Sequence, residues 1–355
     1  MSPVVAMMGA WDPSYPRNRI VRQAMHHAGH EVREVRVRPR RAWLRYPALV
    51  AAFGRRGMDT DVVWVPEFRH KDVVVAKALA GRRPLIFDPL VSRWDTLVGD
   101  WRLHAEGGGQ ARWNRTLDRW SLRSADRVLC DTWVHGELFV SLGARRSQLR
   151  RLLVGAEPAF FEVGPSPPAE RLRILYVGGF LPLHGISTIL EAAARLQAAA
   201  APEHEIVLAG RGIESDEARR IAAREGLSNI RFLGETSYED APQLFAGAHI
   251  ALGAFGTGAK TARVIPHKLW QGLAAGRAVV SGDAPGVREV FRSEEHLRLV
   301  PCGDGAALAD ALLGLLRDEG LRLQLGQAAR QRARETGSVP VLAGEIDELL
   351  REVAA

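Results

Sequence analysis

The chain has 355 residues, of which 46% are hydrophobic and 25% charged, a composition typical of a folded protein with room for two domains. No run of 18 apolar residues occurs and the N-terminus lacks a cationic leader, so neither a transmembrane helix nor a signal peptide is predicted. We therefore expect a cytoplasmic protein whose two cysteines, Cys130 and Cys302, are reduced, buried thiols without metal-ligand spacing.

The net charge of +7 is unevenly distributed along the chain. Residues 1–165 carry 27 Arg and Lys against 17 Asp and Glu, whereas the remainder carries 21 against 24. A basic first half fits an anionic acceptor or a peripheral contact with an anionic membrane surface. Because only four of the 48 cations are lysine, an arginine-rich coding bias is an equal alternative. No zinc pattern, recognition helix or aromatic-basic motif occurs, so no nucleic-acid partner is expected.

Short apolar runs alternate with longer amphipathic segments along both halves. Most of the runs are β-branched and free of Pro, which is typical of buried parallel strands. Between them lie helical patterns such as residues 185–200, with their apolar residues along one face. This alternation predicts α/β sheets of the doubly wound kind. The predicted strands are 3–10, 31–38, 61–67, 84–90, 127–133 and 149–157, then 173–179, 205–211, 229–235, 249–255 and 277–283.

The segment FEVGPSPPAE (161–170) has three prolines and no periodicity, so we interpret it as a linker. It predicts an N-terminal domain over 1–165, a second domain over 166–335, and a C-terminal helix over 336–355 that crosses back onto the first domain. Ligands of such sheets bind beyond the carboxyl ends of the strands. We therefore look for functional residues in the loops that follow each strand, where the two domains would face each other.

One of these loops gathers four potential cations ahead of a small apolar helix: Lys260, Arg263, His267 and Lys268. Pro266 suits a first helical turn, and the helix N-terminus adds free N–H groups and the positive end of its dipole. A merely solvated charged face would contain interspersed acids, but none occurs between Asp240 and Asp283. The pattern predicts an anion site.

The second half is similar to the nucleotide-binding domain of the GT-B glycosyltransferases, specifically glycosyltransferase family four. The resemblance rests on the order of YVGGFLPLHGISTILEAAARL, IVLAGRG, NIRFLGETSYEDAPQLFAGAHIAL, SGDAPGVREVF and CGDGAALADALLGLLRDEGLRLQLGQAAR, which together span nearly all of residues 172–335. It implies GT-B architecture: two Rossmann-like doubly wound parallel-sheet domains facing across a cleft. It also implies transfer of a sugar, with retention, from a nucleotide-diphosphate sugar to a hydroxyl acceptor.

This chain departs from the family pattern at several positions. Arg263 and Gln271 stand where many relatives have two glutamates, and Gly179 and His184 stand where the family commonly has Arg and Lys. The resemblance then implies that other basic residues grip the diphosphate, which makes Arg263, Lys268 and His184 the candidate catalytic residues. The candidate donor-binding residues are Gly9, Gly178, Gly179, Arg211, Gly234, Glu235, Lys260, His267 and Gln271.

Polar residues after the first and fourth predicted strands are candidates for binding the acceptor: Asp12, Arg17, Asn18, Asp88, Asp95 and Asp100. For the residues after the fourth strand, helix capping is the alternative for about half, with Ser92 or Asp95 as N-cap, and Asp131 and His135 are open to the same two interpretations. For the tryptophans we favour a core position over an apolar acceptor surface; these are Trp11, Trp94, Trp101 and Trp113.

Two other functions stay open at this stage. A sugar-nucleotide epimerase on the same scaffold would need an acid/base pair, and a non-catalytic nucleotide-sugar-binding scaffold would need none. No cofactor is expected beyond the nucleotide-sugar co-substrate. No metal is expected either, because neither an Asp-x-Asp motif in a fitting loop nor a His/Cys cluster occurs. A small natural product, a polysaccharide and a lipid-linked sugar all remain open as acceptors.

Overall fold

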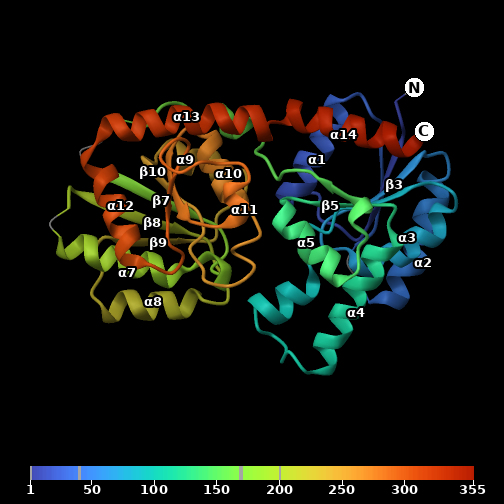
Figure 1. Ribbon diagram of the computed structural model, residues 1–355, viewed down its shortest axis with the longest axis horizontal. Coiled ribbons are helices and arrows are strands. Elements are labelled where there is room, and N and C mark those ends of the chain that lie inside the picture. The colour runs from blue at the N-terminus through green and yellow to red at the C-terminus, as the bar shows by residue number, and fades with distance from the viewer. Residues whose placement is uncertain (1, 39–40, 168–170, 200) are drawn as a thin grey trace. The chain divides into compact units, whose positions relative to one another are not determined.

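The computed structural model describes residues 2–38, 41–167, 171–199 and 201–355 (Figure 1). The chain divides into two compact units, one formed by residues up to Val154 together with Val339–Ala355, the other by Gly155–Ser338. The division therefore falls before the predicted linker, whose last residues, 168–170, lie outside the described ranges. The linker's first part belongs to the second unit because Arg277 donates to the Gly164 carbonyl and the Ser166 hydroxyl, at 2.5 and 2.7 Å.

The first unit contains a six-stranded parallel sheet in the order β2-β1-β3-β4-β5-β6. Helices α2 to α5 bury their apolar faces in one core with this sheet. Helix α14 packs beside α1 and ends at the Arg127 and Arg150 side chains, which both pair with Glu352 (Figure 1). The strands are β1 (Val5–Gly9), β2 (Val32–Arg36), β3 (Val62–Val65), β4 (Leu85–Phe87), β5 (Arg127–Cys130) and β6 (Leu149–Arg151); the helices are α1 (Pro16–His27), α2 (Ala42–Arg56), α3 (His70–Ala80), η1 (Asp95–Asp100), α4 (Gly109–Ser124), α5 (Trp133–Leu142), η2 (Arg146–Gln148) and α14 (Val339–Ala354).

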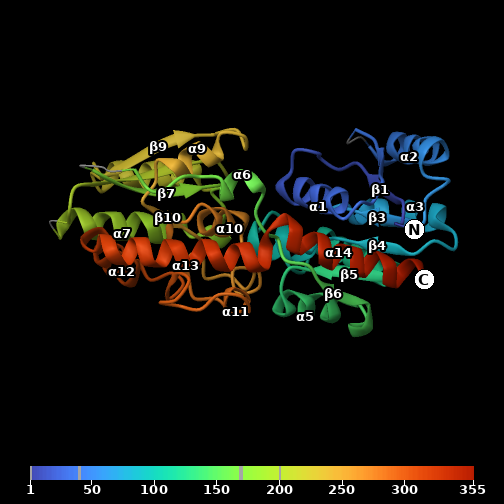
Figure 2. The same ribbon diagram turned by 90° about the horizontal axis from the view of Figure 1, so that it is seen from above.

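The second unit contains another six-stranded parallel sheet, in the order β12-β11-β10-β7-β8-β9. Helices α7, α8 and α12 share one core with the sheet, and α7 and α12 lie side by side in both views (Figure 2). Helix α10 packs against α13. The strands are β7 (Leu172–Val177), β8 (His204–Ala209), β9 (Ile230–Gly234), β10 (Ile250–Leu252), β11 (Ala278–Gly282) and β12 (Arg298–Val300); the helices are α6 (Pro158–Phe161), η3 (Pro182–His184), α7 (Ile186–Ala198), α8 (Ser215–Arg224), α9 (Ala241–Ala246), α10 (His267–Ala274), α11 (Pro285–Arg288), α12 (Gly305–Arg317) and α13 (Glu319–Gly337).

The prediction of two doubly wound parallel sheets is confirmed, and each of the eleven predicted strands overlaps an observed one. Their β-branched residues are buried on both faces of the sheets, as in β3, where all four side chains are buried. Strand β12 was not predicted, because it has three residues and two of them are only half-buried.

Strand order reverses at one point in each sheet. In the first unit β1 lies between β2 and β3, and in the second β7 lies between β8 and β10. The loops that leave such neighbouring strands in opposite directions open a crevice at the carboxyl ends, which is where doubly wound sheets bind ligands. The loops after β1 and β3, and those after β7 and β10, are therefore the places to examine.

Candidate functional site

In the second unit, the loops after β7 and β10 are joined by backbone hydrogen bonds. The amide of Phe255 donates to the His184 carbonyl at 3.0 Å, and the Gly256 amide and the Thr261 hydroxyl both donate to the Leu183 carbonyl, at 3.1 and 3.0 Å. These bonds bring the segment that precedes α10 against the turn that precedes α7.

The loops after β7, β8 and β9 also touch, backbone to backbone. A Cβ on Gly210 would lie 2.0 Å from the Gly178 carbonyl oxygen, and Gly210 has a φ of +139°, so only glycine fits there. The Gly210 amide donates to the Gly234 carbonyl at 2.6 Å. The structure thus gathers the predicted donor residues Gly178, Gly179, Arg211 and Gly234 at one end of the sheet, with Arg211 and the neighbouring Glu235 exposed.

Lys268 lies in the first turn of α10 and points back to β7. Its side chain is 5% exposed, and its Nζ donates to the Tyr176 hydroxyl at 3.1 Å and lies 4.4 Å from the centre of that ring. A Cβ on Gly178, whose φ is +137°, would be 2.8 Å from the Lys268 Cε, so this approach requires glycine. Burial lowers the pKa of Lys268 well below its usual value, because the charged form loses hydration.

His184 lies beside this lysine, at the end of η3. Its Nδ1–H donates to the Gly179 carbonyl, which also accepts the Tyr176 hydroxyl. Burial, and next the positive charge of Lys268, lower the pKa of His184 well below its usual value, so the ring is neutral. His184 therefore binds the backbone through Nδ1, and its role in catalysis stays a prediction.

The other cations of this segment surround the same point. Lys260 is 7% exposed, and its charge also lowers the pKa of His184, so both lysines act on that ring. Arg263 is half-buried and its amide donates to the Lys260 carbonyl at 3.0 Å. Pro266 is the N-cap residue rather than part of the first turn, and α10 begins at His267. Gln271, one turn on from Lys268, is 6% exposed.

In the first unit, the loop after β1 is held by the residues that follow β3. The Ala10 amide donates to the Asp72 carboxylate at 2.9 Å, and Arg69 donates to the Ala10 carbonyl at 2.8 Å. Gly9 has a φ of +145° and would place a Cβ 3.3 Å from that carboxylate. Arg69 and Asp72 were not among the predicted site residues, although the charged residues of 67–72, at the end of a predicted strand, were an available signal.

Glu67, which was not predicted as a site residue either, is buried in the segment that follows β3. Its side chain accepts a hydrogen bond from Asn18, while its Oε2 has no hydrogen-bond partner. Burial raises the pKa of Glu67 to about 8, although the charge of Arg69 and the Asn18 hydrogen bond act in the opposite direction. At neutral pH the carboxyl group is mainly protonated and is a donor as well as an acceptor.

Several predicted acceptor residues make bonds within the protein. Arg17 and Asp88 are 1% and 2% exposed and form an ion pair of 2.8 Å, while Arg17 also donates to the Leu153 carbonyl at 2.7 Å. Asn18 is equally buried and donates to the Asp12 carbonyl at 2.7 Å. The Asp12 carboxylate is exposed and accepts from the amide and hydroxyl of Ser14. These contacts stabilise the loop, and binding of an acceptor by these residues stays a prediction.

The capping alternative is met by Ser92, whose hydroxyl accepts the Asp95 amide at 3.0 Å. Asp95 and Asp100 delimit the π-helical turn η1 and are buried. Asp131 and His135 are buried and pair with each other at 2.7 Å.

The predictions of core positions for the tryptophans and of two buried thiols both need correction. Trp11 is 1% exposed as expected, but Trp113 is 52% exposed because it lies on the outer face of α4. Trp94 and Trp101 are half-buried. Both thiols are free; Cys130 is buried, whereas Cys302 is only partly so.

In the described ranges, no three His, Cys, Asp or Glu side chains are grouped as metal ligands. A search of the same residues found no helix with the length and apolar character needed to cross a bilayer.

Residues 162–332 match the model of the family described as Glycosyl transferases group 1. The matched segment is just under half of the chain, and the family predicted for residues 172–335 is thereby confirmed.

Curated relatives agree with this assignment. A phosphatidyl-myo-inositol mannosyltransferase of Mycolicibacterium smegmatis is 32% identical over 216 residues, which cover 56% of this chain and 52% of the relative. The lipopolysaccharide core biosynthesis glycosyltransferase LpsE of Rhizobium meliloti is 26% identical over 214 residues, 59% of each protein. The matched part of the chain thus spans little more than half the length of these relatives.

Solved structures show the fold over nearly the whole chain. HepE of Anabaena in complex with UDP has a TM-score of 0.73 at 17% identity, covering 99% of this chain and 100% of that one. Sucrose-phosphate synthase of Thermosynechococcus elongatus has a TM-score of 0.76 at 17% identity and covers 99% of both. The fold is that of the GT-B glycosyltransferases.

The raised pKa of Glu67 predicts a pH-dependent stability. Because the folded state keeps its proton up to about pH 8, the free energy of unfolding that Glu67 contributes is fully present below pH 4.5 and falls as the pH rises to about 8. The slope is at most about 1.4 kcal/mol per pH unit. Glu67→Gln removes this slope, so thermal unfolding from pH 5 to pH 9 should show the variant gaining stability relative to wild type as the pH rises.

The exposed Glu106→Gln serves as the control and should follow wild type at every pH. A constant difference between Glu67→Gln and wild type across this range would show that Glu67 titrates like a solvated carboxyl group.

Proposed function

We propose that the protein is a glycosyltransferase that transfers a sugar from a nucleotide-diphosphate sugar to a hydroxyl acceptor. The reaction would proceed with retention of configuration and without a metal ion. The observation that carries the proposal is the buried Lys268 at the strand-order reversal of the second unit, in a segment that belongs to the group 1 family.

The diphosphate fits the loops around Lys268 for three reasons. Gly178, which has no Cβ, lets the Lys268 side chain reach the end of β7, where doubly wound sheets bind phosphates. The N-terminus of α10 adds the positive end of its dipole. Lys260, Arg263 and His267 precede or begin that helix. We assign these residues, with Lys268, to the diphosphate, and Gln271, Arg211, Gly234 and Glu235 to the nucleoside.

The proposed chemistry is electrostatic. When the glycosidic bond to the diphosphate breaks, negative charge grows on the leaving group, and fixed cations in a water-poor site stabilise that charge. Lys268 and Arg263 would act on this charge, and the neutral His184 would position the Gly179 carbonyl or contact the sugar. In this proposal the cations neutralise the diphosphate, as a metal ion does in other enzymes, so transfer should persist in the presence of a chelator. The anomeric configuration of the product tests whether the reaction proceeds with retention.

The nucleotide is the first element to test, by thermal stabilisation with UDP, GDP, ADP, CMP and dTDP. HepE was solved with UDP and with UDP-glucose, which makes UDP the first candidate. We expect stabilisation by one of these nucleotides and a much smaller effect in Lys268→Met, which keeps an apolar chain of similar length but has no amine. Lys77→Met on α3 is the matched control and should respond like wild type.

Calorimetry in buffers of different ionisation enthalpy gives this test a specific signature. Since burial lowers the pKa of Lys268 and a bound diphosphate raises it again, binding should take up protons in wild type but not in Lys268→Met over the pH range in which this amine titrates. Binding then weakens as the pH rises. Stabilisation by no nucleotide would contradict the proposed function, and binding without transfer would indicate a scaffold.

Turnover should depend on the cations more strongly than binding does. Because charge on the leaving group develops in the transition state, we expect Arg263→Ala and Lys268→Met each to lower kcat by roughly ten- to a thousandfold, with smaller effects on KM. Arg288→Ala is the control, since Arg288 is exposed and pairs with Asp283. An unchanged kcat in either site variant would remove that residue from the mechanism.

We further propose that the first unit contacts an anionic membrane surface through α2. Trp43 and Val50 share one face of this helix and are 68% and 49% exposed, while Arg41 and Arg55 flank it. An exposed apolar face bordered by cations is typical of helices that lie in the bilayer interface. The M. smegmatis relative is named for a lipid substrate, which supports a lipid-linked acceptor.

Flotation with vesicles that contain anionic lipid tests this contact. Wild type should float with the vesicles, and Trp43→Ser/Val50→Ser should lose most of the bound fraction, because exposed apolar side chains supply the insertion free energy. Leu323→Ser on α13, which alters another exposed apolar side chain, should bind like wild type. Equal binding by all three proteins would contradict the role of α2.

A further inference from the structure

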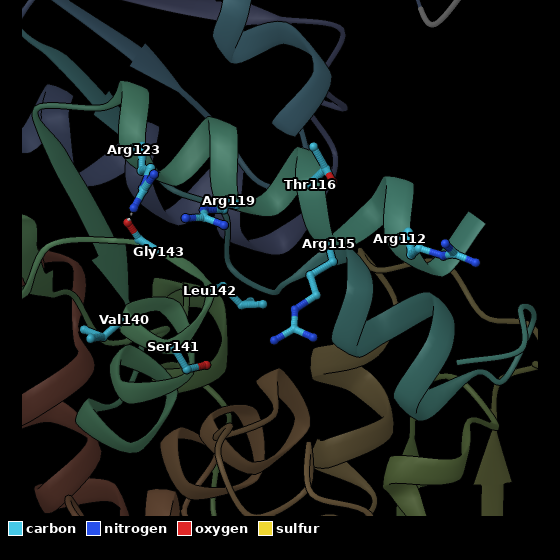
Figure 3. Close-up of a pocket in the computed structure, with 9 residues that line it drawn as sticks. All are labelled: Arg112, Arg115, Thr116, Arg119, Arg123, Val140, Ser141, Leu142 and Gly143. Carbon is cyan, nitrogen blue, oxygen red and sulfur yellow. Dashed lines mark hydrogen bonds between the residues drawn. The ribbon is translucent and has the colours of Figure 1, made fainter. Parts of the chain in front are cut away.

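A hollow of about 580 Å³ lies in the first unit, between α4 and the C-terminal end of α5 (Figure 3). One wall is formed by Arg112, Arg115, Arg119 and Arg123 of α4, together with Thr116, and the opposite wall by residues 140–143. No residue of this lining is acidic. None of these residues enters the function proposed above.

The four arginines form a continuous row. They are spaced by three, four and four residues, which places them along one face of the helix, and all four are exposed. Arg112 donates to the Gly107 carbonyl at 3.2 Å, Arg123 donates to the Gly143 carbonyl at 3.3 Å, and the Arg115 guanidinium lies 5.5 Å from the Trp94 ring centre. In Figure 3, Arg115 extends into the hollow.

This row lacks internal charge compensation. In the part of the chain that the structure describes, none of the four arginines pairs with a carboxylate; Asp118 on the same helix is buried against His70, and Glu137 of α5 pairs with Arg146. Like charges three or four residues apart repel each other on a helix. An anionic ligand would remove that repulsion, and guanidinium groups bind phosphate and carboxylate through paired hydrogen bonds.

We propose that this groove binds an anionic oligosaccharide, as a subsite for the acceptor. The row from Arg112 to Arg123 is about 16 Å long, so a single phosphate contacts only part of it, whereas a chain with several anionic groups contacts it all. The exposed indoles of Trp113 and Trp120 lie one above the other on the adjoining face of α4 and offer apolar surfaces to sugar rings. The inference rests on the proposed transferase function for the saccharide nature of its ligand.

The shape of the surface separates this ligand from a membrane. The groove is concave and its lining contains no exposed large apolar side chain, whereas a bilayer needs an apolar face that inserts, as α2 presents. A flexible charged chain can enter the hollow and follow the row of arginines.

The test uses the full chain and two charged saccharides, a galacturonate hexamer and a phosphorylated mannan fragment. Maltohexaose is the uncharged counterpart. In calorimetry, we expect at least one charged saccharide to bind wild type and maltohexaose to bind poorly. Arg115→Gln/Arg119→Gln should lose at least about tenfold in affinity for the charged saccharide, because each substitution removes a paired guanidinium contact. Arg38→Gln/Arg82→Gln removes the same charge from exposed sites elsewhere in the first unit and should stay within twofold of wild type.

Other outcomes overturn the proposal. These are no binding of either charged saccharide, an equal loss in both double variants, or dependence on the arginine row only for anionic vesicles or a single-stranded oligonucleotide. Circular dichroism and nucleotide stabilisation of the same variants verify that they are folded. They also separate the two proposals, since a protein that binds nucleotide but no charged saccharide keeps the transferase function and loses the subsite. A protein that binds the charged saccharide but no nucleotide keeps the groove and loses the transferase function.

Discussion

The approach of Lys268 to Gly178 is the contact on which the candidate donor site depends. An amine held over the Tyr176 ring, at the end of a buried strand, is placed there only because Gly178 has no Cβ. Burial of a charge is unfavourable unless a partner compensates for it, and the Tyr176 hydroxyl is a weak partner. In the proposed function, a diphosphate supplies that partner: its negative charge would restore the charged form of Lys268 and gain the interaction.

The loops beside the strand-order reversal are held by different means in the two units. In the second unit, glycines allow the backbones of neighbouring loops to touch, as Gly210 does at Gly178, so position is fixed by main-chain hydrogen bonds. In the first unit, the loop after β1 is fixed by side chains, with Asp72 and Arg69 holding the two sides of Ala10. Both sets of contacts lie at the carboxyl ends of strands beside the strand-order reversal of their own unit, where doubly wound sheets bind ligands.

The sequence predicted the strands well, because a parallel sheet buried on both faces imposes β-branched runs that a local pattern reveals. It also indicated Lys268, since four potential cations without acids are visible in the chain. Its burial against Tyr176 was not predictable, because the two residues are far apart in sequence. The same holds for Glu67, whose raised pKa comes from its burial. The prediction for Trp113 was wrong because the burial of an aromatic residue on a helix depends on which face of the helix packs against the core, and the sequence does not show this for α4.

Two groups of arginines in the basic first half of the chain differ in their contacts. Arg17, Arg45 and Arg69 are drawn inward by carboxylates or carbonyls, and they stabilise the loops at the end of the sheet. The arginines that line the hollow on α4 pair with no carboxylate among the described residues and share one face of one helix. A coding bias toward arginine explains why these cations are not lysines, but it acts on every position alike. The four arginines of α4, however, are aligned along a hollow whose lining contains no acidic residue. A coding bias does not explain this alignment, whereas selection for binding an anionic ligand would.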